Sequence, residues 1–307
     1  MNEARRKIGI ALLVIVILWL VSFSLSNLLK FEETSVSNKI AIIPITGFLA
    51  GEETESLLGE TGASSRTIAS FIEQADKDPS VNGIILEINS GGGTVLAGKE
   101  IAEAVKKTQK PTVALIREVG ASGAYWVASA ADKIVADEMS ITGSIGVTSS
   151  YLEFSGLMEK YGVGYEELKS GQYKEAGSPF RELTPEERKM LQEKIDKIQA
   201  YFLKEIKENR NLSEETMKEV GKAGIYLGME AYEINLVDYL GDREVAIKIT
   251  KELAGIKEAK LVRYEERKGL IDLIGRLSAE SYYNIGRGIG AGIIDRSKTE
   301  NTLEIIS

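Results

Sequence analysis

The sequence contains neither histidine nor cysteine, and these two absences exclude several kinds of chemistry. Without cysteine the chain has no disulfide, no thiol nucleophile and no zinc ribbon. Without histidine it has no Ser-His-Asp triad and no imidazole ligand for a metal ion or a haem. Acid-base catalysis therefore depends on lysine, aspartate, glutamate or tyrosine, and we expect no metal or other cofactor.

The charge balance excludes another class of function. The 307 residues include 38 basic and 46 acidic side chains, which gives a net charge of -8. A protein that binds nucleic acid needs a broad basic face for the phosphates, so we expect no nucleic-acid partner. The contents of apolar residues (43%) and charged residues (27%) are ordinary for a globular protein, and the length suits one or two domains.

The N-terminal segment has the properties of a membrane anchor. Residues 8–29 carry no formal charge, and about 20 such residues are enough to cross a bilayer. The basic residues Arg5, Arg6 and Lys7 precede this stretch, so the positive-inside rule places the N-terminus in the cytoplasm and the body outside the cell membrane. A cleaved signal peptide is the alternative, although its apolar region usually spans only about 7–15 residues. We predict a cytoplasmic segment (1–7), a single transmembrane anchor (8–29), a linker (30–38), an extracytoplasmic domain (39–264) and a C-terminal tail (265–307).

Apolar runs and helical patterns alternate along the extracytoplasmic domain. The runs lack strict alternation of polar residues, which is typical of strands that are covered on both faces. Predicted strands are 39–45, 81–88, 111–116, 133–135, 141–147 and 261–264; predicted helices are 66–76, 95–108, 124–131, 184–209, 213–220 and 243–253. This order predicts an α/β fold with a largely parallel sheet.

A first glycine-rich turn, residues 89–95 (Asn-Ser-Gly-Gly-Gly-Thr-Val), joins a predicted strand to a helix. Its backbone N–H groups can bind a developing negative charge. Residues 93–99 also fit the phosphate-loop spacing, but Glu100 stands where a magnesium-binding hydroxyl belongs, which disfavours nucleotide binding. A purely structural tight turn remains an alternative.

Two further turns contain serine. Residues 120–125 read Gly-Ala-Ser-Gly-Ala-Tyr at a predicted strand-to-helix junction, where Ser122 is either a helix N-cap or an exposed nucleophile with the N–H of Gly123 as an oxyanion donor. Residues 141–147 (Ile-Thr-Gly-Ser-Ile-Gly-Val) include Ser144, and a bulged strand is the structural alternative there.

The order of four motifs resembles the signal peptide peptidase A family of membrane-anchored serine proteases. These motifs are I-N-S-G-G-G-T-V, G-A-S-G-A-Y, T-G-S-I-G-V and S-G-Q-Y-K-E-A-G-S-P-F-R, and the resemblance covers residues 39–245. It implies repeated ββα units of the Clp protease and crotonase type. Two positions depart from the family pattern: Gly91 replaces a usual proline, and Asn235 replaces a usual glycine, which is tolerable because asparagine also adopts the left-handed conformation.

The resemblance also implies a Ser/Lys dyad, in which Ser122 is the nucleophile and Lys174 the general base. A lysine can serve as a base if its ammonium group is desolvated enough to lose its proton. We therefore expect Lys174 in a pocket without a close carboxylate, with Ser144 rather than Glu175 as its partner. The oxyanion donors implied are the N–H groups of Gly123 and of Gly92 or Gly93, and the residues expected to line substrate pockets are Ala121, Ala124 and Tyr125.

The implied substrates are signal peptides left in the membrane and other apolar peptides. Some family members have a doubled chain, so this shorter one is expected to form a homo-oligomeric ring in which Ser122 and Lys174 come from neighbouring subunits. Three alternatives remain: a related protease that cleaves stomatin-like proteins, a crotonase-like acyl-thioester enzyme, and a non-catalytic membrane scaffold.

Overall fold

The structure is a computed structural model that describes residues 13–24, 38–52 and 62–265. Residues 13–24 form a helix with exposed side chains, and the rest of the predicted anchor lies outside the described residues. Within the described ranges, no helix combines the length and the apolar character needed to cross a membrane. The predicted tail also lies outside these ranges, except for Glu265.

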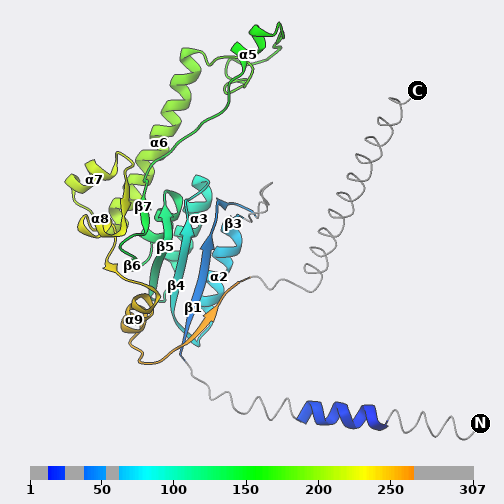
Figure 1. The fold of residues 1–307 in the computed structure, drawn as a ribbon, viewed down its shortest axis with the longest axis vertical. Helices are drawn as coiled ribbons and strands as arrows, with labels where there is room; N and C mark the ends of the chain where they lie inside the picture. Colours follow the sequence, from blue (N-terminus) through cyan, green and yellow to red (C-terminus); the bar gives the residue numbers. More distant parts are fainter. Residues whose placement is uncertain (1–12, 25–37, 53–61, 266–307) are drawn as a thin grey trace, which may run out of the picture. The chain divides into compact units, whose positions relative to one another are not determined.

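A largely parallel sheet forms the centre of the domain, with β5 in its middle (Figure 1). Its order is β10-β1-β4-β5-β6-β9, and β7 adds to β5 while β8 pairs with β7. All pairs in this sheet are parallel except the antiparallel pair of β7 and β8. The strands are β1 (Lys39–Thr46), β4 (Val81–Ser90), β5 (Thr112–Ala121), β6 (Lys133–Ala136), β7 (Ile141–Gly143), β8 (Ile225–Leu227), β9 (Tyr239–Leu240) and β10 (Lys260–Arg263); β2 (Leu49–Ala50) and β3 (Ala63–Ser64) form a small separate pair. The predicted mixed α/β fold with a mostly parallel sheet is confirmed, and it is consistent with a Clp-protease-like fold.

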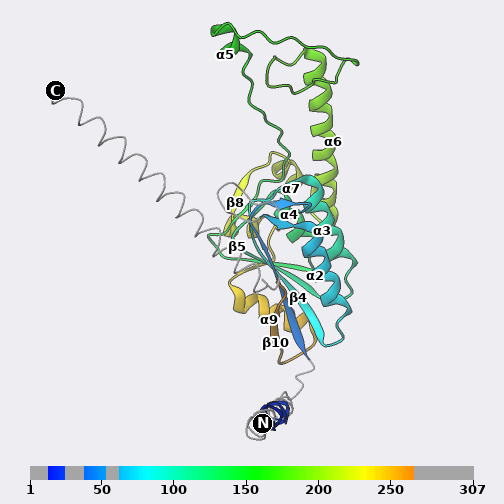
Figure 2. The same cartoon turned by 90° about the vertical axis from the view of Figure 1, so that its right-hand side faces the viewer.

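Helices cover both faces of this sheet, which explains the apolar runs in its strands. In β1, Ala41, Ile43 and Ile45 belong to the core beneath α2 and α3, whereas Ile40 and Ile42 pack with α9 on the opposite face (Figure 2). The helices are α2 (Ser65–Lys77), α3 (Val95–Lys107), α4 (Gly123–Ser129), α5 (Ser155–Lys160), α6 (Pro185–Arg210), α7 (Glu214–Val220), α8 (Gly228–Glu233) and α9 (Arg243–Ala254). Burial on two faces therefore decides the strand composition.

The predicted start of the long helix α6 is confirmed in detail. Thr184 caps it, and Pro185 occupies the first turn. The Thr184 hydroxyl accepts the N–H of Glu187 at 3.2 Å, and the Glu187 carboxylate accepts the N–H of Thr184 at 3.0 Å. This reciprocal pair satisfies two N–H groups that would otherwise lack partners.

One predicted strand is shorter than expected. The strand predicted over 141–147 ends at Gly143, because Gly143 and Ser144 both adopt positive φ angles of 83° and 49°. Asn235 has a φ of 61°, which fits its expected tolerance of the left-handed region.

A long exposed segment separates β7 from α6. We call residues 148–184 the arm; it contains α5, and no residue in it is buried. Figures 1 and 2 both place α5 away from the main sheet, at the end of the domain where α6 begins. The predicted general base, Lys174, lies in this arm.

Candidate active site

Ser122 lies where β5 ends and α4 begins, in an unusual backbone conformation. Its φ and ψ are 54° and -124°, a region that side-chain-bearing residues rarely adopt. Its N–H donates to the Gly143 carbonyl at 2.8 Å, and its own carbonyl accepts the first hydrogen bond of α4, from Trp126 at 3.0 Å. The hydroxyl makes no capping bond. Ser122 therefore occupies the N-cap position of α4, as one alternative expected, but its side chain does not cap the helix and stays available for other chemistry.

The first glycine turn lies directly against Ser122 because β4 and β5 are neighbours, with Ser90 paired to Gly120. A Cβ atom added to Gly92, whose φ is 100°, would lie 2.8 Å from the Gly123 nitrogen and 2.9 Å from the Ser122 Cβ. A Cβ atom added to Gly123 would lie 3.5 Å from the Gly93 nitrogen. The backbones of the two turns are thus in close contact, and the position of Gly92 permits only glycine.

This geometry favours Gly93 over Gly92 as the second oxyanion donor. The Gly92 N–H is directed to the Ser90 hydroxyl at 3.1 Å. Leu49 makes both backbone hydrogen bonds to the residues that flank Gly93. The Leu49 N–H donates to the Gly92 carbonyl, and the Leu49 carbonyl accepts from the Thr94 N–H. In a parallel bridge of this kind the N–H of the middle residue, Gly93, points to the opposite side.

The Gly123 N–H is the other candidate oxyanion donor, beside that of Gly93. As the first residue of α4, Gly123 has no intrahelical acceptor for its N–H. The Gly123 nitrogen, in the residue after Ser122, and the nearby Gly93 nitrogen are therefore the two candidate oxyanion donors.

Ser144 lies beside Ser122 on the neighbouring strand. β5 and β7 pair Ala121 with Gly143, so the two serines each follow one member of this pair. The Ser144 N–H donates to the Gly224 carbonyl at 2.7 Å, which fixes the left-handed turn. The structure therefore brings together Ser122, Ser144 and the glycines of the first turn.

The sequence analysis did not identify Gln199 as part of this region. Its side-chain Nε2 on α6 donates to the carbonyl of Ile145 at 3.0 Å, immediately after Ser144. Gln199 shares a helix face with the buried Phe202 and Ile206, three and seven residues further on. A polar residue on the apolar face of a helix was the available signal.

Lys174 does not lie at this site within one chain. Lys174 is exposed in the arm, where its backbone N–H donates to the Gly171 carbonyl at 3.3 Å. Among the described residues, no hydrogen bond joins Lys174 to Ser122 or Ser144. The expected burial of Lys174 is therefore not met in the single chain. Glu175, which we did not expect as its partner, accepts a hydrogen bond from the Tyr165 hydroxyl at 3.2 Å.

Two of the residues predicted to line substrate pockets belong to the core instead. Ala124 and Tyr125 are fully buried, and Ala121 is only 7% exposed. The Tyr125 hydroxyl donates to the Leu236 carbonyl at 2.8 Å, and burial raises the pKa of Tyr125 well above its ordinary value. The apolar face of α4 turns inward onto the sheet, so these side chains stabilise the fold and Tyr125 stays protonated.

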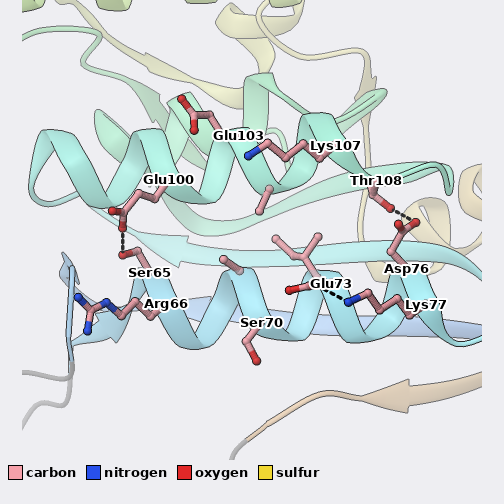
Figure 3. A pocket seen from close by; sticks show the side chains of 13 residues that line it. Ser65, Arg66, Ser70, Glu73, Asp76, Lys77, Glu100, Glu103, Lys107 and Thr108 are labelled. Carbon is pink, nitrogen blue, oxygen red and sulfur yellow. Dashed lines mark hydrogen bonds and ion pairs between the residues drawn. The ribbon is translucent and has the colours of Figure 1, made fainter.

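A cavity of about 640 Å³ lies elsewhere, between α2 and α3 (Figure 3). Hydrogen bonds from Ser65 to Glu100 at 2.5 Å and from Thr108 to Asp76 at 2.6 Å join the two helices across it. None of the predicted site residues lines this cavity. Glu100 thus has a structural partner, and Lys99 pairs with Glu103 on its own helix rather than with the glycine turn, which argues against nucleotide binding. In the described part of the chain, no three acidic side chains are grouped as a metal site would need.

Comparison with known proteins identifies the family. The profile described as Peptidase family S49 matches residues 104–257, a span that contains Ser122, Ser144 and Lys174. The chain belongs to peptidase family S49. A Methanocaldococcus jannaschii protein named as a protease is 38% identical over 79% of this chain and 78% of its own length. An Enterococcus faecium protein named as signal peptide peptidase SppA is 32% identical over 76% of this chain and 69% of its own length.

A longer relative matches over part of its length. Protease 4 of Haemophilus influenzae is 30% identical over 76% of this S49 chain but only 38% of its own length. Among solved structures, a mutant of a membrane-bound stomatin-specific protease aligns with 75% of the chain and 99% of its own, at 11% identity and a TM-score of 0.46. Membership of peptidase family S49 supports a serine protease.

Proposed function

We propose that this S49 protein is a membrane-bound serine endopeptidase that degrades signal peptides and other apolar peptides. The observation that carries the proposal is the strained Ser122, whose hydroxyl makes no capping bond and whose backbone lies in close contact with the first glycine turn. A nucleophile placed within reach of two preorganised donors is what acyl transfer requires. The names of the relatives support peptide hydrolysis as the reaction.

The proposed reaction is a two-step acyl transfer. Lys174 accepts the hydroxyl proton of Ser122, and the Ser122 Oγ attacks the carbonyl carbon of the peptide. The Gly93 and Gly123 N–H groups stabilise the oxyanion, and the leaving amine takes a proton from Lys174. Water then attacks the acyl-enzyme while Lys174 accepts its proton; Lys174 returns this proton to the Ser122 Oγ as the bond to the acyl group breaks, and the acyl group leaves as a carboxylic acid. Ser144 orients Lys174 in this scheme.

The proposed site combines residues of neighbouring subunits. In one chain Ser122 lies at the end of β5, whereas Lys174 lies in the exposed arm. The arm exposes many large apolar side chains, which is typical of surfaces that bind another protein. They include Tyr151, Leu152, Phe154, Leu157, Tyr161, Val163, Tyr165, Leu168, Tyr173 and Phe180. A homo-oligomeric ring covers this surface and supplies Lys174 to a neighbouring Ser122.

The proposed location follows from the N-terminal segment. Residues 8–29 form the single membrane anchor, with the N-terminus in the cytoplasm and the Clp protease and crotonase type of domain outside. The exposed apolar side chains of the helix over residues 13–24 support contact with lipid. This anchor keeps the protease close to peptides that remain in the bilayer after secretion.

Three variants of the full chain in detergent micelles test the proposal. Ser122→Ala and Lys174→Ala are each expected to lower kcat for a peptide substrate by at least about 10³-fold, with the fold intact by circular dichroism. Lys189→Ala, an exposed lysine on α6, is the control and is expected to keep wild-type activity. Near wild-type activity of either dyad variant would exclude the mechanism.

Mixed oligomers test whether the site is shared. Chains that carry Ser122→Ala and chains that carry Lys174→Ala are inactive alone, but in a random ring about one quarter of the interfaces pair an intact Ser122 with an intact Lys174. Co-expression of the two chains is therefore expected to restore part of the activity. No restoration in verified mixed oligomers would place both groups in one chain.

A further inference from the structure

The arm contains an ion-pair cluster whose role the proposed function does not explain. Residues 148–201 bury a single residue, and this residue is the charged Glu187. The motif that carries Lys174 ends at Arg181, which the proposed reaction leaves without a role. We call Glu167, Arg181 and Glu187 the arm cluster.

Arg181 binds Glu187 with two parallel hydrogen bonds. Its Nη1 donates to Glu187 Oε2 at 2.8 Å, and its Nη2 donates to Oε1 at 2.7 Å. The side chain of Glu187, in the first turn of α6 next to the exposed arm, is only 2% exposed. Paired Arg-carboxylate bonds of this kind fix direction as well as distance.

The arm cluster closes the loop that carries Lys174. Glu167 Oε2 lies 3.2 Å from Arg181 Nε. This ion pair joins the two ends of the loop 167–181, which contains Lys174. The rings of Tyr165 and Phe180 lie 5.2 Å apart next to this pair and close the loop a second time. Through Glu187 the loop is tied to the first turn of α6.

An arm without an apolar core needs such ties to hold one shape. Isolated surface ion pairs stabilise little, but a paired guanidinium-carboxylate contact within a network is the exception. In the arm, the general base of the proposed reaction has no buried packing of its own. The position of Lys174 therefore depends on the arm cluster.

We propose that Arg181 is a positioning residue for Lys174: its paired bonds to Glu187 and its contact with Glu167 hold the loop in the shape that presents Lys174 to Ser122. The inference rests on the proposed function, because it needs Lys174 as the general base. It adds a residue that touches neither the substrate nor the reacting atoms.

Kinetics of the full chain in detergent micelles test this role. Arg181→Gln is expected to lower kcat by about 10- to 100-fold, as a displaced catalytic group does, with KM changed by less than about twofold. Arg188→Gln is the matched control. Arg188 follows Glu187 in the first turn of α6, is exposed and, among the described residues, makes no ion pair. Arg181→Lys keeps the charge without the paired geometry, so its kcat is expected to lie between those of the wild type and Arg181→Gln.

The split between kcat and KM separates positioning from general damage, because a displaced base lowers kcat without weakening the binding of the peptide. A kcat equal to that of Arg188→Gln would contradict the inference.

The inference and the proposed function fail in different ways. If Lys174→Ala keeps its activity, the proposed function fails and Arg181 has no base to position. If Lys174→Ala is inactive and Arg181→Gln matches Arg188→Gln, only the positioning role fails. In the Lys174→Ala background, Arg181→Gln is expected to cause no further loss. A change of oligomeric size in Arg181→Gln, measured by light scattering, would also overturn the inference, since Arg181 would then act on assembly.

Discussion

The indole ring of Trp126 stacks on the phenyl ring of Phe202, with centroids 4.4 Å apart and planes 15° from parallel. Trp126 belongs to the first turn of α4, and its backbone N–H donates to the carbonyl of Ser122. Phe202 lies in the second half of α6, whose first turn holds the arm. This contact therefore connects the helix that starts at the candidate nucleophile with the helix that follows the arm, in which the candidate base lies.

Loss of this stacking is expected to destabilise the domain. Phe202 is 3% exposed, so Phe202→Ala removes a large buried side chain and should lower the free energy of unfolding by about 3–5 kcal/mol. The neighbouring Tyr201→Ala is the control, because Tyr201 is 43% exposed and should cost far less. Urea denaturation measures both, and equal losses would contradict the importance of the stacked contact.

The glycines of the first turn are expected to differ sharply in their tolerance of a methyl group. A Cβ atom at Gly93 would lie 2.0 Å from the Leu49 carbonyl oxygen, and Gly92 combines a positive φ with contacts under 3.0 Å to residues 121–123. Gly92→Ala and Gly93→Ala should therefore displace the oxyanion donors and lower kcat by about 10²-fold or more.

Gly91→Ala supplies the contrast in the same turn. No atom lies within 4 Å of a Cβ placed at Gly91. The variant is expected to keep full activity and to gain up to about 1 kcal/mol in stability, because alanine restricts the unfolded chain. Peptidase assays and thermal denaturation of all three variants check the order, and a strong loss of activity in Gly91→Ala would show that the turn is shaped differently.

Gln199 is expected to matter because it holds the segment after Ser144. Gln199→Leu removes the bond from Nε2 to the Ile145 carbonyl and should cost about 1 kcal/mol of stability. Activity should fall as well, since the Ser144 turn loses a support. Gln192→Leu on the same helix breaks only an exposed bond to Asp196 and is expected to leave the activity unchanged. Similar activities of the two variants would contradict a special role for Gln199.

The arm is expected to loosen in acid. The hydrogen bonds from Arg181, and then the N–H of Thr184, lower the pKa of Glu187 from its ordinary value of 4.5 to about 2. A depressed pKa of a carboxyl group stabilises the ordered arm above the ordinary value, and this stabilisation is lost as the pH falls from about 4.5 towards about 2.

Hydrogen exchange across residues 167–187 measures this loss. Protection in the wild type should fall as the pH is lowered from about 4.5 towards about 2, whereas Glu187→Gln should show low protection that changes little over the same range. Wild-type protection that is unchanged in acid would show that the Glu187 carboxylate does not hold the arm.

Much of the fold could be predicted from the sequence because the strong signals are local. Buried apolar runs such as 81–88, and the cap at Thr184, lie within one element and report its type directly. The short elements β8, α8 and β9 were missed, since segments of two to six residues carry too little periodicity. The end of β7 depends on the left-handed Ser144, which no pattern of apolar residues reveals.

The candidate site was predicted in part, for a similar reason. Motif order selected Ser122, Ser144 and the glycine turns, and neighbouring parallel strands bring them together. Gly93 could not be separated from Gly92 until the bonds of Leu49 were known. All seven residues of α4 are buried, because α3 and α6 pack on this helix as well as the sheet, and no local pattern of residues shows that packing.

The ion pairs of the arm also determine how it responds to heat and to salt. The hydration free energy of charged groups becomes less favourable as temperature rises. The desolvation penalty of the ion pair between Arg181 and Glu187 therefore falls on heating, and the pair contributes more to stability at high temperature. Dissolved salt screens the more open ion pair between Arg181 and Glu167. The ordered arm is therefore expected to be destabilised more by high salt concentration than by high temperature.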